Sequence, residues 1–386
     1  MSANRPIYLD YNSTTPVDDR VLEKMLPYFS ENFGNASSST HSNGWIAADA
    51  VEIARGQVAN LLHVEPSEIV FTSGATESIN LAIKGVWQRY HTKGKHIVVV
   101  ATEHKAVLDC CVSLEELGAE ITRLSVDEFG LVKIKEFESA IRSDTVLVAV
   151  MLANNETGVI QPVSQIAEIV HEKNCVFLCD ATQAIGKIEV DVQQLGLDLV
   201  PISSHKIYGP KGAGALYVRR KSPRVSLTPL IEGGGHERGL RSGTLNVPGI
   251  VGLGMACEVA QMNIASERNR IALLRNMLLE LLEQESEVHI NGVLDKSLPN
   301  TLNVSFGRII ADRLLKTMVT KVSLSTGSAC TSALKKPSHV LKAMGLSDER
   351  AYGSVRFSLG RFTTEEEIKE AASIVIEELQ KLKVLK

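Results

Sequence analysis

Several features that mark secreted, membrane or nucleic-acid-binding proteins are missing from this sequence of 386 residues. No stretch approaches the ~20 apolar residues of a membrane span, and the first residues, Met1 to Pro6, contain no apolar signal core. The formal net charge of −4 gives no basic signature, so we expect no direct binding of nucleic acid. No internal repeat or disordered tract stands out. These absences favour a cytoplasmic globular protein.

Cysteine is scarce, with six residues in the chain. Six cysteines in a chain of this length do not form a disulfide framework, and no pair of Cys-x-x-Cys motifs indicates structural zinc. We therefore expect no resident metal. A free cysteine is usually an inert buried side chain, and we expect this of five of them. Cys330 differs, because the small residues from Leu324 to Ala333 are typical of an accessible loop.

Apolar, strand-like runs alternate with helical segments through the first half of the chain. This alternation predicts a mainly parallel sheet with helices on both faces, which binds ligands at the carboxyl ends of its strands. The chain is long enough for two domains. We expect strands at 68–72, 97–101, 120–125, 145–150, 175–179 and 214–218, with helices near 18–30, 45–62, 76–90, 105–117, 133–141 and 162–173.

Lys206 lies between the apolar run 197–202 and a turn rich in glycine and proline. At the end of a strand, desolvation lowers the pKa of a lysine amine and makes it nucleophilic. A lysine that forms a Schiff base needs this property. The alternative is an exposed lysine in an ordinary turn, because short lysine contexts recur by chance.

Two further segments suggest a phosphate-bearing cofactor. Asp180 ends the apolar run 175–179, where it could hold the pyridinium nitrogen of pyridoxal phosphate (PLP) protonated; the alternative is a helix N-cap. The small residues Ser73 to Thr76 join a strand to a helix, which predicts an anion site of backbone N–H groups. Ordinary capping by Ser73 or Thr76 is the alternative here.

With these residues in place, the chain closely resembles the cysteine desulfurases of the iron–sulfur and nitrogen-fixation type, which are fold-type I PLP enzymes of the class-V aminotransferase family. The resemblance covers nearly the whole chain. It implies an α/β fold, with a mainly parallel seven-stranded sheet in the large domain and a small α+β domain. The motifs that carry it are Asn12 to Pro16, Gly34 to Ser38, Gly74 to Glu77, Thr102 to His104, Asn154 to Gly158, Asp180 with Gln183, Ser204 to Lys206, Arg241 to Thr244, Gly327 to Cys330 and Arg356 to Ser358.

The fold type also implies how the domains divide. A long helix at 248–284 leads from the large domain, 16–262, into the small one, which combines 1–15 with 263–386. We expect strands at 7–10, 288–290 and 301–306, helices at 311–318 and 363–382, and a mobile cysteine loop at about 324–335.

The resemblance assigns a role to each site residue. Lys206 binds PLP as a Schiff base and then acts as a base at the substrate α-carbon, while His104 stacks on the ring and relays protons. Asp180 pairs with the pyridinium and Gln183 hydrogen-bonds the phenolic oxygen. A threonine from a partner subunit, matched by Thr244, completes the phosphate site, which implies a homodimer. The other phosphate ligands are Ala75, Thr76, Ser203 and His205.

The substrate implied is L-cysteine, which becomes L-alanine. Arg356 matches the arginine that binds the carboxylate, with Arg361 as the alternative, and Asn155 orients the substrate. Arg241 stays open between an interface residue and a solvated charge. Cys330 takes the sulfur as a persulfide, and could transiently share a cluster with a scaffold protein.

The acceptor of the sulfur stays open. By resemblance it is a protein that serves iron–sulfur cluster assembly, tRNA thiolation, a thio-cofactor or sulfur modification of nucleic acid. The alternative function is a selenocysteine lyase or another fold-type I PLP lyase or aminotransferase. Cys330 discriminates between them, because only sulfur transfer through a protein persulfide requires it.

Overall fold

The computed structural model describes residues 5–285, 287–307, 309–326 and 337–384. Seven strands form one sheet in the order β2-β8-β7-β6-β5-β3-β4. Only β8 runs antiparallel to its two neighbours, so the predicted mainly parallel, seven-stranded sheet is confirmed. The strands are β2 (Ile69–Thr72), β3 (His96–Val100), β4 (Glu120–Leu124), β5 (Thr145–Ala149), β6 (Val176–Leu178), β7 (Leu199–Ser203) and β8 (Gly214–Val218).

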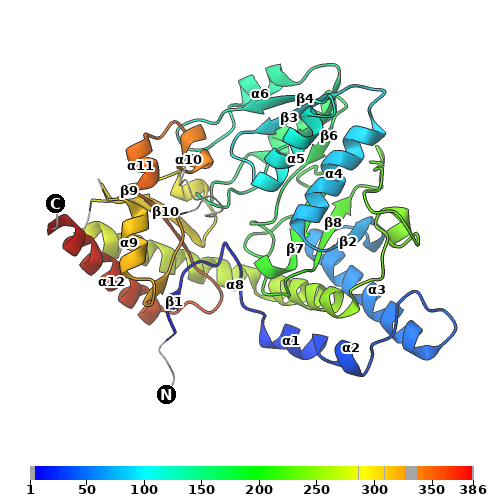
Figure 1. The fold of residues 1–386 in the computed structure, drawn as a ribbon, viewed down its shortest axis with the longest axis horizontal. Coiled ribbons are helices and arrows are strands. Elements are labelled where there is room, and N and C mark those ends of the chain that lie inside the picture. Colours follow the sequence, from blue (N-terminus) through cyan, green and yellow to red (C-terminus); the bar gives the residue numbers. More distant parts are fainter. Residues whose placement is uncertain (1–4, 286, 308, 327–336, 385–386) are drawn as a thin grey trace.

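Helices cover both faces of this sheet (Figure 1). Successive residues of a strand point to opposite faces, and β3 shows the consequence. Ile97 and Val99 pack into one apolar cluster with α4 and α5, whereas Val98 and Val100 pack into another with α3, α7 and the first part of α8. The covering helices are α3 (Ser42–Leu62), α4 (Ala75–Arg89), α5 (Lys105–Glu115), α6 (Ile134–Ala140), α7 (Val163–Glu172) and α8 (Val247–Glu285).

The single helix that we expected at 18–30 is wrong. The structure has α1 (Asp19–Met25) and α2 (Pro27–Ser30), with Pro27 as the first residue of the second helix. Proline has no N–H to continue the hydrogen-bond ladder of α1, but it fits the first helical position well. The chain therefore restarts its helix at Pro27.

A second region gathers around the far end of α8, at the left of Figure 1. Its apolar cluster combines Ile7 and Leu9 with residues between Ile271 and Leu379. We propose this cluster as the core of the smaller domain, with the boundary inside α8 near residue 262. Its strands are β1 (Ile7–Tyr8), β9 (His289–Ile290), β10 (Thr301–Ser305), β11 (Val322–Ser323) and β12 (Ser354–Ser358), and its helices are α9 (Ala311–Thr317) and α12 (Glu365–Val384).

Two short helices connect this region back to the sheet. They are α10 (His339–Ala343) and α11 (Asp348–Tyr352), which the sequence pattern did not predict. Val340 and Leu341 of α10 pack into the same apolar cluster as α3 and α7. The helix α10 therefore contacts the domain of the large sheet.

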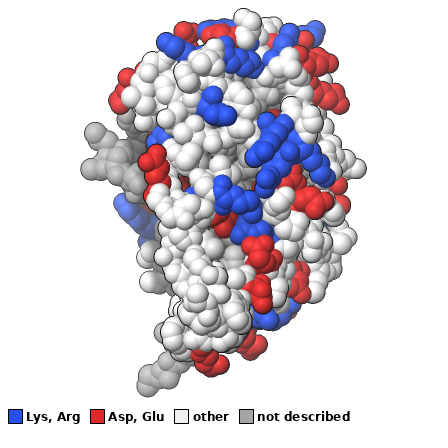
Figure 2. Space-filling model, turned by 90° about the vertical axis from the view of Figure 1, so that its right-hand side faces the viewer, with Lys and Arg blue, Asp and Glu red and all other residues white. Residues whose placement is uncertain are grey.

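Among the described residues, α8 alone is long and apolar enough to cross a membrane by length and composition, and 61% of its most apolar window is buried in the protein. It packs against α1, α3 and α12. The surface of the protein carries charged side chains of both signs. On the face in Figure 2, Lys and Arg side chains gather beside Asp and Glu side chains, so neither charge covers the whole face.

Candidate active site

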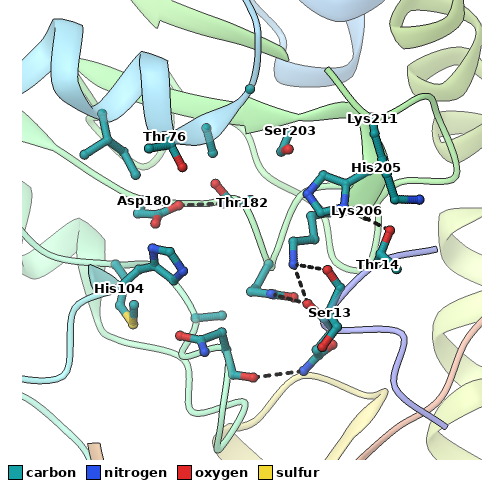
Figure 3. Close-up of a pocket in the computed structure, with 18 of the residues that line it drawn as sticks. Ser13, Thr14, Thr76, His104, Asp180, Thr182, Ser203, His205, Lys206 and Lys211 are labelled. Atoms are coloured by element: carbon teal, nitrogen blue, oxygen red, sulfur yellow. Dashed lines mark hydrogen bonds between the residues drawn. The ribbon is translucent and has the colours of Figure 1, made fainter. Parts of the chain in front are cut away.

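The carboxyl ends of β2, β3, β6 and β7 meet at one edge of the sheet. This includes β2, because it is antiparallel to β8 and β8 is antiparallel to β7. A cavity of about 670 Å³ lies beyond this edge, as expected for an open α/β sheet. Figure 3 shows side chains pointing into it. Among its lining residues are the predicted Ala75, Thr76, His104, Asn155, Asp180, Gln183, Ser203, His205, Lys206 and Arg356.

Lys206 ends the short 3₁₀ helix η2 (Ser204–Lys206), directly after β7. Its Nζ donates to the backbone oxygens of Asn12, at 2.5 Å, and Ser13, at 2.7 Å (Figure 3). Burial, with the nearby cation of Arg356, lowers the pKa of Lys206 to about 8. A sizeable fraction of the amine is therefore unprotonated near neutral pH, as a nucleophile requires. Lys206 is a cavity residue and not an ordinary turn lysine.

Asp180 follows β6 and is buried, with 7% of its surface exposed. Its Oδ1 accepts a hydrogen bond from the backbone N–H of Thr182 at 3.0 Å. Residues 182–184 form a turn and no helix follows, so the alternative of a helix N-cap is wrong. The hydroxyl of Thr182 is buried and has no hydrogen-bond partner in residues 5–285, 287–307, 309–326 and 337–384.

His104 is the N-cap of α5, and its Nδ1 accepts the N–H of Ala106 at 3.1 Å. The neutral ring must then carry its hydrogen on Nε2. Desolvation by the cavity walls lowers the pKa of His104, although Asp180 opposes the shift. The cavity thus contains a neutral imidazole whose tautomer is fixed by the backbone.

An anion site is formed where β2 leads into α4. Gly74 precedes the helix with φ of 152°, a conformation that glycine adopts most readily. The strand β8 passes against this turn so closely that a Cβ on Gly214 would lie 2.5 Å from the Cα of Gly74. The free N–H groups of the first turn of the 15-residue helix favour a negative charge. The hydroxyls of Thr76 and Ser203 lie on the same side of the cavity (Figure 3).

His205 lines the same cavity (Figure 3). Burial lowers its pKa to about 4, with Lys206 and Lys211 adding to the shift. Its Nδ1 lies 3.1 Å from the hydroxyl of Thr14. His205 is therefore neutral near pH 7, and it can hydrogen-bond an anion but adds no charge.

Arg241 is half-buried in an ion pair and does not line the cavity. Its Nε donates to Oε1 of Glu77 at 2.8 Å, while the other oxygen of Glu77 accepts the N–H of Ser73. Burial pushes the pKa of Glu77 up, but the hydrogen bonds from Arg241 and Ser73 outweigh it and the pKa is lowered. Thr244, three residues further on, is exposed and does not line the cavity of its own chain.

Arg356 extends from β12 to the cavity, and 3% of its surface is exposed. Its guanidinium donates hydrogen bonds to the backbone oxygen of Asn155 at 2.8 Å, to Oδ1 of Asp10 at 2.7 Å and to the hydroxyl of Ser13 at 3.0 Å. Its Nε is buried and has no hydrogen-bond partner within the part of the chain that the structure describes. A buried donor without an acceptor is costly, so this group is suited to a ligand.

Arg361, the alternative for binding a carboxylate, is committed elsewhere. It forms ion pairs with Asp18 at 2.7 Å and Glu267 at 2.6 Å. Its guanidinium also lies 4.2 Å from the centre of the Tyr208 ring. Arg361 thus joins α8, the segment before α1 and the small domain, and does not line the cavity.

Some cavity residues were not expected from the sequence. The loop Asn12 to Pro16 was named only as a motif of the resemblance, yet Asn12 is 1% exposed and accepts hydrogen bonds from Gln183 and Lys206. Met151 and Thr182 follow the carboxyl ends of β5 and β6, where ligands of such sheets bind. The sequence could therefore have indicated them. Cys330 lies outside the described residues, and Ser325, just before that gap, lines the cavity. The other unexpected lining residues are Glu77, Ile79, Ala153, Lys211 and Gly212.

Comparisons with known proteins identify the family. A profile of the class-V aminotransferases matches residues 7–370. A protein named cysteine desulfurase IscS from Anaeromyxobacter dehalogenans is 53% identical over 98% of this chain and 93% of its own length. The protein of the same name from Neisseria meningitidis is 51% identical over 100% of this chain and 95% of its own length. The chain belongs to the class-V aminotransferases, in their cysteine desulfurase group.

Solved structures support the same assignment. A NifS-like protein aligns with a TM-score of 0.91 and 41% identity, over 98% of this chain and all of the other. A structure described as SspA in complex with cysteine aligns with a TM-score of 0.80 and 38% identity, over 92% of this chain and 99% of the other. The predicted fold type I is confirmed by these likenesses.

This family implies PLP as the cofactor, and the cavity fits it. The α4 N-terminus and two hydroxyls suit a phosphate, and the buried carboxylate of Asp180 would suit a pyridinium nitrogen. The buried hydroxyl of Thr182 and Nε of Arg356, which have no hydrogen-bond partner among the described residues, suit polar contacts with a group bound in this cavity. The donors and acceptors therefore match a group with one anionic end and one cationic ring.

Proposed function

We propose that this chain is a cysteine desulfurase that converts L-cysteine to L-alanine and takes up the sulfur on Cys330. The observation that carries the proposal is the meeting of Lys206, Asp180 and Arg356 in one cavity. An amine with a lowered pKa, a buried carboxylate and a buried guanidinium supply the groups that amino-acid chemistry on PLP requires. The names of the relatives agree with this assignment.

In this proposal each strand end holds one part of PLP, which acts as an electron sink when bound. The N–H groups at Ala75, with Thr76 and His205, hold the phosphate. Asp180 faces the ring nitrogen and Gln183 the phenolic oxygen. The buried hydroxyl of Ser203 would donate a hydrogen bond to the same phosphate.

The protein's own groups then handle the substrate. Arg356 and Asn155 bind and orient the carboxylate of L-cysteine, which places the α-hydrogen toward Lys206. The unprotonated Nζ of Lys206 removes that proton, because its pKa of about 8 leaves a usable fraction of free base. His104, neutral and with its hydrogen on Nε2, can pass a proton to or from the reacting sulfur.

The sulfur transfer needs no external oxidant. The carbon–sulfur bond of the substrate breaks while a sulfur–sulfur bond forms to the thiolate of Cys330. The electron pair of the broken bond stays on carbon, which takes up a proton to become the methyl group of alanine. The overall change is one cysteine and one thiol to one alanine and one persulfide.

The first experiment measures alanine and sulfide released from L-cysteine by the wild-type protein and by Cys330→Ala, with PLP and a reductant. We expect release by the wild type and its loss in the variant, while Cys110→Ala, which changes a buried cysteine away from the cavity, keeps it. Equal release by Cys330→Ala would favour a general PLP lyase such as a selenocysteine lyase. No product from the wild type would overturn the proposed activity.

The active unit in this proposal is a homodimer in which Thr244 of each subunit completes the phosphate site of the other. Thr244 is exposed on its own chain. Large apolar side chains are also exposed on α2, on α3 and in the segments beside α2, as expected of a surface that another copy covers. They include Leu26 at 54%, Phe29 at 62%, Phe33 at 68%, Trp45 at 55% and Ile53 at 62%.

A complementation experiment tests the shared site. A dimer of one Lys206→Ala subunit and one Thr244→Ala subunit contains one site in which both residues are intact, provided that Thr244 acts across the interface. Mixing the two variants under exchange conditions should restore activity that neither shows alone. No recovery in a proven mixed dimer, or full activity of a monomer in the analytical ultracentrifuge, would remove Thr244 from the site.

The persulfide sulfur is passed to acceptor proteins, such as an iron–sulfur scaffold or a tRNA thiolation protein. We propose the cytoplasm as the place of action, since the five described cysteines are free thiols, as reducing compartments maintain them. Labelled sulfur on Cys330 should move to a purified acceptor of the right class, and its retention with every candidate would point to another acceptor.

A further inference from the structure

Lys187 is an enclosed amine for which the sequence suggested no role. It comes four residues after Gln183, and its Nζ donates to Oε1 of Gln183 at 2.7 Å and to Oδ1 of Asn12 at 3.3 Å. Within the described part of the chain, the structure shows no ion pair between Lys187 and an acidic residue. Burial lowers the pKa of Lys187 well below its ordinary value, and the cations of Lys206 and Arg356 add to the shift. Enclosing an amine in this way is costly, so its partners are informative.

The hydrogen bonds around Gln183 fix the direction of its amide. A backbone oxygen can only accept, so the group of Gln183 that lies 2.9 Å from the oxygen of Asn12 must be Nε2. The other side of the amide is then Oε1, and it receives the hydrogen of Lys187. Both the charged and the neutral amine can donate this bond, so the arrangement does not depend on the charge of Lys187.

Asn12 is fixed in the same way. Its Nδ2 donates to the backbone oxygen of Asn155 and to the hydroxyl of Thr301. Its Oδ1 must therefore face the two donors, Lys187 and Asn300. The backbone oxygen of Asn12 also accepts from Lys206. Lys187 is therefore joined to the reactive lysine through one buried asparagine, and to the cavity wall through Gln183.

We propose that Lys187 is a positioning residue, which holds the amide of Gln183 so that its remaining N–H points to the phenolic oxygen of PLP. The inference rests on the proposed function. Lys187 acts through Gln183, because it is not among the described residues that line the cavity, whereas Gln183 is. Removing Lys187 leaves Oε1 without its donor, and the amide can turn away from the cofactor.

A double-mutant cycle tests this role. Lys187→Met, Gln183→Ala and the double variant are compared with the wild type by the dissociation constant of PLP and by the visible absorption of the bound cofactor against pH. We expect Lys187→Met to weaken PLP binding about two- to tenfold, the worth of one hydrogen bond, and to shift the pH at which the absorption changes. In the Gln183→Ala background, Lys187→Met should change neither quantity.

Two further variants separate positioning from general destabilisation. Lys187→Gln keeps an N–H donor and should recover part of the loss, and it replaces Lys187→Met in the cycle if that variant does not fold. Lys173→Met removes an exposed lysine of the same domain and should leave both readouts unchanged. Additive effects in the cycle, or unchanged readouts in a folded Lys187→Met, would overturn the proposal. A wild-type protein that binds PLP but forms no alanine would instead contradict the proposed activity alone.

Discussion

The two walls of the cavity are built in different ways. The cofactor wall consists of strand ends of one sheet, so the backbone ladder of that sheet sets the spacing of Thr76, His104, Asp180 and Lys206. The substrate wall is assembled from segments far apart in the sequence: Arg356 contacts Asp10, 346 positions away. The first wall is a property of one domain. The second exists only when both regions are folded and packed together.

This difference predicts where substitutions act. Changes on the cofactor wall should affect PLP binding or the chemical step, because those groups touch the reacting atoms in the proposed mechanism. Changes on the substrate wall should chiefly affect the affinity for cysteine. The following predictions test this distinction, from the largest expected effect to the smallest.

Lys206→Ala should lower the rate of alanine formation by roughly 10³-fold or more, since it removes the base and the covalent attachment point together. The variant should keep the circular dichroism spectrum of the wild type, because the side chain lies at the cavity and not in an apolar cluster. Alanine formation is measured with saturating PLP. A normal rate would contradict the assignment of Lys206.

Arg356→Gln and Arg361→Gln form a matched pair five positions apart. Arg356→Gln should raise KM for L-cysteine about 10- to 100-fold, the worth of a charged hydrogen bond. Arg361→Gln should leave KM near the wild-type value but lower Tm, because it leaves Asp18 and Glu267 without their partner. Steady-state kinetics and thermal melts distinguish the two. The opposite pattern would make Arg361 the substrate residue.

The pH dependence of PLP uptake should report the amine of Lys206. Its folded pKa of about 8 lies below the ordinary value of 10.5, so the neutral amine becomes available as the pH rises through 8. The rate of PLP incorporation into apoprotein should rise across this range and then level off. In the same window the unfolded chain binds more protons at this site than the folded one, so this lysine makes apoprotein stability rise with pH. A rate that is flat from pH 7 to 9 would contradict the shift.

Arg241→Gln should have the smallest effect. The ion pair with Glu77 is partly exposed, with 21% and 15% of the side chains accessible, and such pairs contribute about 1 kcal/mol or less. Without Arg241 the carboxylate of Glu77 beside the phosphate site is uncompensated, so PLP should bind about two- to fivefold more weakly. Arg241→Gln combined with Glu77→Gln should recover most of this loss, and a double variant as weak as the single one would show that Arg241 acts elsewhere.

Much of the cofactor wall could be predicted because its signals are local. An apolar run followed by Asp180 or Lys206 places the side chain at a strand end, and the strand ends of a parallel sheet share one edge. The pattern of strand, small-residue turn and helix found Thr76 in the same local way, whereas His104 came from the resemblance to the family. The helix break at Pro27 is equally local, and the sequence pattern missed it only because the apolar spacing continues across the proline.

The substrate wall could not be read in this way from spacing alone. Arg356 and Arg361 are five positions apart and were separated only by what the fold places against each of them: the cavity in one case, and Asp18, Glu267 and the ring of Tyr208 in the other. The pairing of Arg241 with Glu77 joins positions 164 apart. No local pattern carries such information.

The sequence by itself therefore determined the α/β architecture, the strand ends that carry the reactive groups and the family to which the chain belongs. These follow from the period of apolar residues and from short motifs, which are local properties. Only the tertiary structure decided which arginine faces the cavity, how Asn12 joins Lys206 to Gln183, and why Lys187 is enclosed beside them. Those contacts join side chains from remote segments, and they arise when the two regions pack against each other.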